Sequence, residues 1–157
     1  MIKKVLLLTL AALLALSMLT SCGAKEKLTA DELVEQLINE AGYKIFSDTR
    51  DDPSADGSVY VSLLAPHDDY FINFYEFPTN ERASEAFDRA KVQLGTVSGA
   101  WRSKTEVNAN NHNIYKGINN GYYYVYSRIE NTLLEVMYAE EKYKSEVDEI
   151  LEKLGYK

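Results

Sequence analysis

The residue pair Asn120-Gly121 separates two runs of alternating residues, and it constrains the fold of this chain more than any other feature. Both central positions of a type I′ hairpin turn need a positive φ, which Asn and Gly adopt more readily than other residues. The flanking runs, residues 112–118 and 122–129, are rich in Tyr, Val and Ile and alternate as strands do. The pair therefore predicts an antiparallel β-hairpin in the C-terminal half of the chain.

More strands are expected on either side of this hairpin. Residues 100–107 alternate before a turn at residues 108–111, and residues 132–139 follow the short turn Glu130-Asn131. The C-terminal half thus predicts a β-meander. Three earlier segments also have strand character: residues 43–47, 59–65 and 70–77. A Pro-His-Asp-Asp turn separates the second of these segments from the third.

Three segments have the apolar spacing of amphipathic helices. The first begins with a capping box, in which Thr29 is the N-cap residue and Glu32 lies three residues later. The second begins at Thr79 or Asn80, and the third follows the last predicted strand. The glycines expected to end these helices are Gly42, Gly95 and Gly155.

These elements predict an α+β fold for residues 28–157. We expect a single domain with an antiparallel sheet of about five to seven strands and three helices packed on one of its faces. Since side chains alternate along a strand, only one face of each strand meets the helices. The side chains assigned to this covered face are Val125, Ile129, Leu134 and Val136. The uncovered face is expected to carry a row of Tyr122, Tyr124, Tyr126 and Arg128, with Tyr115 beside it.

The N-terminal segment has the layout of an export signal. Lys3 and Lys4 precede an apolar run that ends in Leu19-Thr20-Ser21-Cys22. This ending resembles the lipobox of bacterial lipoproteins. The resemblance implies that residues 1–21 are a cleaved signal peptide and that Cys22 carries a lipid. Residues 22–27 would then be a short tether, and the protein would be anchored in a bacterial cell envelope, on the extracytoplasmic side of the membrane.

Two other interpretations of this segment remain open. The run from Val5 to Ser21 is at the short limit for a membrane-spanning helix, and an ordinary signal peptide could be cut elsewhere. Lipidation accounts for one further observation, because Cys22 is the only cysteine of the chain. The domain therefore has no disulfide, and its stability depends on its core.

The charge of the chain excludes one class of partner. The formal net charge is −7, and the signal segment contains Lys3 and Lys4 but no acidic residue. The mature part is therefore still more acidic, whereas nucleic-acid binding requires a basic surface. We expect the membrane as a partner through the lipid, and an envelope protein or a glycan as a possible second partner.

The row of Tyr side chains is the main candidate for a binding surface. The chain has twelve Tyr residues, and such rings give a large contact area at low entropic cost. The sequence thus favours a binding module that recognises a protein or a glycan through this face. Two structural interpretations compete: the rings could simply suit a half-buried sheet, or the loop of residues 48–57 could cover them. A structural or accessory envelope lipoprotein without a small ligand is the alternative function.

Catalysis and metal binding have weaker support. His67 beside Asp68 and Asp69 could serve as the base of a hydrolase, but it lies in a predicted turn, and no known catalytic motif or glycine-rich phosphate loop is present. We therefore expect neither an enzyme nor a cofactor. The acidic loop with Asp48, Asp51, Asp52 and Asp56 does not have the spacing of an EF-hand, and no metal site is expected.

Overall fold

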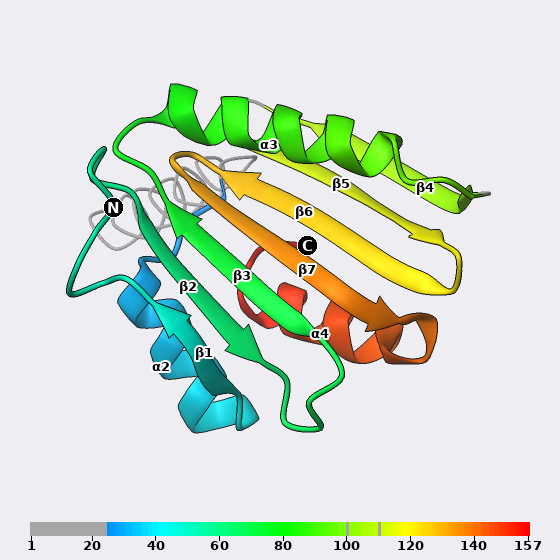
Figure 1. The fold of residues 1–157 in the computed structure, drawn as a ribbon, viewed down its shortest axis with the longest axis horizontal. Helices are drawn as coiled ribbons and strands as arrows, with labels where there is room; N and C mark the ends of the chain where they lie inside the picture. The colour runs from blue at the N-terminus through cyan, green and yellow to red at the C-terminus, as the bar shows by residue number, and fades with distance from the viewer. Residues whose placement is uncertain (1–24, 100, 110) are drawn as a thin grey trace, which may run out of the picture.

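The structure, a computed structural model, describes residues 25–99, 101–109 and 111–157. It is built on a seven-stranded sheet in which every pair of neighbouring strands is antiparallel (Figure 1). The strands lie in the order β1-β2-β3-β7-β6-β5-β4. Their bounds are β1 (Lys44–Asp48), β2 (Val59–Leu64), β3 (Phe71–Glu76), β4 (Trp101–Asn108), β5 (His112–Asn119), β6 (Tyr122–Ile129) and β7 (Thr132–Glu140).

The described residues form three α-helices: α2 (Ala30–Ala41), α3 (Asn80–Gly95) and α4 (Lys144–Lys153). A short 3₁₀ helix, η1 (Glu141–Tyr143), leads into α4. After β3 the chain passes through α3 to the far edge of the sheet, and β4 to β7 then return as a meander that ends beside β3. The α+β class, the number of strands and the meander are all confirmed.

Local sequence signals explain where several elements begin and end. Thr29 and Glu32 form the predicted capping box at the start of α2, and Gly42 ends this helix in the left-handed region. Asn120 and Gly121 both have a positive φ in the turn between β5 and β6, as a two-residue hairpin of this type requires. None of the helices in the described residues is long and apolar enough to cross a membrane.

The helices lie on both faces of the sheet, which corrects the prediction of three helices on one face. Helices α2 and α4 cover one face, behind the sheet in Figure 1, and α3 lies on the other face. The larger core contains Val125, Ile129, Leu134 and Val136, all fully buried as predicted. Helix α3 builds a second, smaller core on the opposite face.

The adjacent residues Leu133 and Leu134 show why both faces are covered. They point to opposite faces of β7, and Leu133 belongs to the smaller core while Leu134 belongs to the larger one. A strand that is apolar on both faces must be buried on both faces. Helix α3 supplies the second cover with an apolar stripe that includes Phe87, Ala90 and Leu94.

Candidate functional site

Helix α3 covers most of the predicted row of Tyr side chains. Tyr115 is only 2% exposed and Tyr126 only 7% exposed, and both pack beneath Phe87 of this helix. Arg128 is also buried, where it donates to Asn113 Oδ1 and to the backbone carbonyl of Glu130, each at 2.7 Å. The prediction that these side chains lie on an uncovered face is therefore wrong.

Tyr122 and Tyr124 lie at the other end of the row and behave differently. Tyr122 is exposed and Tyr124 is half-buried, because they lie beyond the part of β6 that α3 covers most closely. Tyr124 contacts the indole of Trp101, with the ring centroids 6.2 Å apart. This end of the sheet also holds the hairpin turns at residues 66–69 and 120–121. We call it the distal end, because Lys25 and Lys27 contact the turns at the opposite end.

An exposed aromatic cluster lies at the distal end, on the α3 side of the sheet. It consists of Phe46, Phe71 and Tyr138, and we call it the distal patch. The Phe46 and Phe71 rings meet edge to face at 5.1 Å, and the Phe71 and Tyr138 rings do so at 6.4 Å. Phe46 is 68% exposed and Tyr138 is 59% exposed. The three rings come from β1, β3 and β7, and these strands therefore present the apolar surface that α3 leaves open.

Two backbone irregularities place these rings on the same side. The register between β1 and β2 shifts at Phe46, and the register between β6 and β7 shifts opposite Tyr124. Tyr138 has a φ of +65°, which is uncommon for a bulky side chain. A bulge inserts one extra residue and redirects the side chains that follow it. Strict alternation along the sequence could therefore not have assigned Phe46 and Tyr138 to this face.

A polar row crosses the sheet beside the distal patch. Ser62 donates to Asn73 Oδ1 at 2.7 Å, and Asn73 lies directly opposite Glu135 on β7. Burial raises the pKa of Glu135 to about 7, although hydrogen bonding to Asn73 and Tyr75 acts in the opposite direction. Glu135 is thus a partly buried carboxyl group on the same face as the patch.

Glu135 lines a cavity of about 240 Å³ between α3 and the sheet. We call this space the Glu135 cavity. The other side chains around it come from β3, from the segment that follows β3, from α3 and from β7. They are Tyr75, Phe77, Ala86, Arg89, Ala90, Gln93 and Leu133.

His67 connects the turn between β2 and β3 to helix α4. Its Nδ1 lies 3.2 Å from Asp69 Oδ2, and its Nε2 lies 3.1 Å from Glu146 Oε1. The imidazole also stacks on Tyr143, with the ring centroids 4.3 Å apart. Both ring nitrogens are thus bound to carboxylates of the protein itself.

The other members of this network are structural. Tyr70 donates to Glu146 Oε1 at 2.7 Å, and its hydroxyl lies 2.5 Å from that of the buried Tyr43. Asp68 points elsewhere and pairs with Lys44 at 3.0 Å. The network therefore holds the turn against α4, and this geometry gives the hydrolase hypothesis no additional support.

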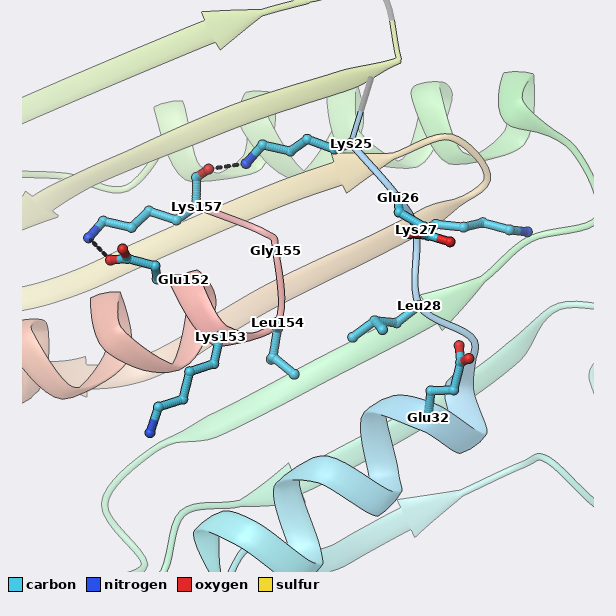
Figure 2. Close-up of a pocket in the computed structure, with 10 residues that line it drawn as sticks. All are labelled: Lys25, Glu26, Lys27, Leu28, Glu32, Glu152, Lys153, Leu154, Gly155 and Lys157. Atoms are coloured by element: carbon cyan, nitrogen blue, oxygen red, sulfur yellow. Dashed lines mark hydrogen bonds and ion pairs between the residues drawn. The ribbon is translucent and has the colours of Figure 1, made fainter. Parts of the chain in front are cut away.

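A groove of about 770 Å³ lies where the described chain begins, beside the end of α4 (Figure 2). Leu28 and Leu154 point toward one another across it. Lys25 donates to the backbone carbonyl of Lys157, and Lys157 in turn pairs with Glu152 at 2.8 Å. These two ammonium groups are thus already bound to carboxylate or carbonyl oxygens nearby.

The segment before α2 is fixed to the domain by specific contacts. The backbone amide of Lys25 donates to Asn111 Oδ1 at 3.3 Å, and Asn111 Nδ2 donates to the carbonyl of Lys25 at 2.7 Å. Lys27 donates to Asn131 Oδ1 at 2.6 Å. Part of the predicted tether is therefore docked on the sheet. Cys22 and the predicted signal segment lie outside the described residues.

The acidic loop is held by its own contacts. Asp48 pairs with Arg50 at 2.6 Å, and Asp56 accepts from Ser54 and from the amide of Ser58. Within the described ranges, no group of three or more His, Cys, Asp or Glu side chains is arranged to hold a metal ion.

Neither the distal patch nor the Glu135 cavity was expected from the sequence. An acidic residue in an alternating strand usually points toward solvent, so nothing in the sequence marks Glu135 as shielded from water. We compared the chain with protein-family models, curated proteins and solved structures, and none of them matches it.

Proposed function

We propose that this protein is a lipid-anchored binding protein of a bacterial cell envelope, which recognises another protein on the extracytoplasmic side of the membrane. The lipobox-like ending Leu19-Thr20-Ser21-Cys22 supports the anchor, as does the absence of any other cysteine. The docking of Lys25 on Asn111 supports a location close to the membrane, because it shortens the free tether.

The exposure of the distal patch is the observation that best supports recognition of a partner. Burying a large apolar side chain is worth roughly 1.5–3 kcal/mol, and the exposed rings of Phe46 and Tyr138 forgo much of this stabilisation in the free protein. Apolar clusters that remain exposed in this way are typical of interaction sites.

The geometry of the patch favours a protein over a glycan. The planes of the Phe46 and Phe71 rings meet at 71°, and those of Phe71 and Tyr138 meet at 77°. Rings in this arrangement form pockets for apolar side chains rather than one flat platform for a sugar. Strand β1 adds a second feature, because among the described strands it lies at the edge of the sheet and pairs only with β2. The free backbone groups of an edge strand can pair with an extended segment of another protein.

Site-specific photo-cross-linking in intact cells tests the proposed recognition. A photoreactive residue at position 46 or 138 should give an adduct of discrete mass, whereas the same residue at Val92, an exposed position on α3, should not. The double variant Phe46→Ser with Tyr138→Ser should lose the partner, and Val92→Ser should keep it. Equal adducts at all three positions would contradict the proposal, and the absence of any adduct would favour the accessory lipoprotein.

The anchor has its own test. Cells fed an alkyne-labelled fatty acid should label the wild-type protein, and the Cys22→Ser variant should be unlabelled and lost from the membrane fraction. Labelling that persists in Cys22→Ser would show that the lipid is attached elsewhere.

A further inference from the structure

Glu135 is a partly buried acid without a cationic partner among the described residues. It lies on β7 between Asn73 of β3 and Tyr126 of β6, and desolvation is the main cause of its raised pKa. No Lys or Arg contributes to that shift, and none of the ion pairs among the described residues includes Glu135. A carboxylate removed from water without a counter-ion is costly, so such a group calls for an explanation.

The Glu135 cavity gives this carboxyl group access to a ligand. The space exists because α3 presents the small side chains of Ala86 and Ala90 to the sheet at this point. Arg89 also lines the cavity, but its side chain is exposed and pairs with Glu85 at 3.9 Å on the helix surface. The one cationic side chain in the lining thus has another partner.

The aromatic lining suits the same kind of ligand. The rings of Tyr75 and Phe77 lie nearly parallel, with 14° between their planes and 6.0 Å between their centroids. The face of an aromatic ring attracts cations. A carboxylate and two ring systems around one small space form a site whose charge is complementary to an ammonium group.

We propose that the Glu135 cavity binds an organic ammonium group, with the Glu135 carboxylate as its counter-ion and the Tyr75 and Phe77 rings beside it. The volume of about 240 Å³ equals that of roughly eight water molecules in the liquid, which is enough for the end of a lysine side chain. The site is on the same face of β7 as the distal patch. Phe71 of the patch lies opposite Met137 on β7, and Glu135 is two residues, or about 7 Å, from Met137 along this strand.

Two sources could supply the ammonium group: a free amine, or a lysine of the protein that docks on the distal patch. Only the second source rests on the proposed function. Ammonium binding can therefore be tested without any partner protein.

The test uses n-butylammonium as a probe, with 1-butanol as the uncharged control of the same shape. Both are titrated into the lipidated protein in detergent micelles near pH 8, and binding is followed by NMR at the amides of β7 and α3. We expect saturable shifts around Glu135 and Ala90 with butylammonium only. Equal shifts with butanol would overturn the charge recognition, and equal shifts at exposed acids would show non-specific ion pairing.

Three variants complete the test. Glu135→Gln removes the charge but keeps the shape, and we expect at least a tenfold loss of affinity. Ala86→Leu fills the cavity and leaves the charge, so it should also abolish binding. Glu140→Gln removes an exposed acid from the same strand and should have no effect. Unchanged binding in both Glu135→Gln and Ala86→Leu would refute the site.

A carbodiimide, which joins a carboxylate to a neighbouring amine as an amide, then distinguishes the two sources. If the ligand is a lysine of the partner, Glu135 is coupled to a peptide of the protein captured at position 46 or 138. If the ligand is a free amine, butylammonium binds but no such peptide adduct forms. The first result supports the proposed function as well, whereas the second leaves the ammonium site in place without it.

Discussion

Replacing Glu135 with Gln should change how the stability of the protein depends on pH. Burial raises the pKa of Glu135 from 4.5 to about 7. Since one pKa unit corresponds to about 1.4 kcal/mol, ionising this group costs the folded state about 3 kcal/mol. The amide of the Glu135→Gln variant has a similar shape and does not ionise.

Folding stability should fall as the pH rises, because the unfolded chain loses the Glu135 proton at a lower pH than the folded protein does. As the pH rises above 4.5, the unfolded chain releases the proton of Glu135 while the folded protein still holds it. The folded state therefore loses stability relative to the unfolded state until the pH passes about 7, and the loss is complete above that value. The contribution is favourable only at acidic pH.

Urea unfolding at a series of pH values measures this effect. The free energy of unfolding of the wild type, minus that of Glu135→Gln, should fall by about 3 kcal/mol between about pH 4 and about pH 8. All other titrating groups, such as His112 with its lowered pKa, cancel in the difference. A difference that stays flat over this range, or rises, would refute the claim that Glu135 is desolvated without a cationic partner.

Two further changes test the packing and the hydrogen bonds. Gly117→Ala places a Cβ against the backbone carbonyl of Ser103 and 2.9 Å from the indole of Trp101, and it should destabilise the protein by about 1–3 kcal/mol. Gly95→Ala, where nothing lies within 4 Å, should be neutral or stabilising in the same thermal melts. Tyr70→Phe leaves the buried hydroxyl of Tyr43 without its neighbour and should cost about 1–3 kcal/mol in urea unfolding; an unchanged midpoint would show that this contact is not formed.

Much of the fold could be predicted because its signals are local. The capping box at Thr29 and Glu32 and the turn at Asn120-Gly121 each depend on a few neighbouring residues, and the structure confirms both. The buried state of Val125, Ile129, Leu134 and Val136 followed from alternation within single strands.

The candidate site could not be predicted, because it depends on contacts between distant segments. Whether Tyr126 is exposed or buried depends on which face of the sheet α3 packs against. The apolar stripe of α3 is equally compatible with either face. Bulges add a second difficulty. The register shift between Trp101 and Ser103 interrupts the alternation expected along residues 100–107.

The fixed position of Lys25 sets the direction in which the domain faces. With Cys22 acylated as proposed, only three residues join the lipid to Lys25, a reach of at most about 11 Å. The turns that hold Asn111 and Asn131 must therefore rest close to the lipid head groups.

Strand β7 runs away from this end, and at about 3.3 Å per residue it carries Tyr138 about 20 Å along the sheet from Thr132. An upright domain would thus present the distal patch across the space beyond the membrane rather than along its surface. A partner anchored in the same bilayer would have to reach up by that distance, whereas one attached to the opposite side of the envelope would meet the patch directly.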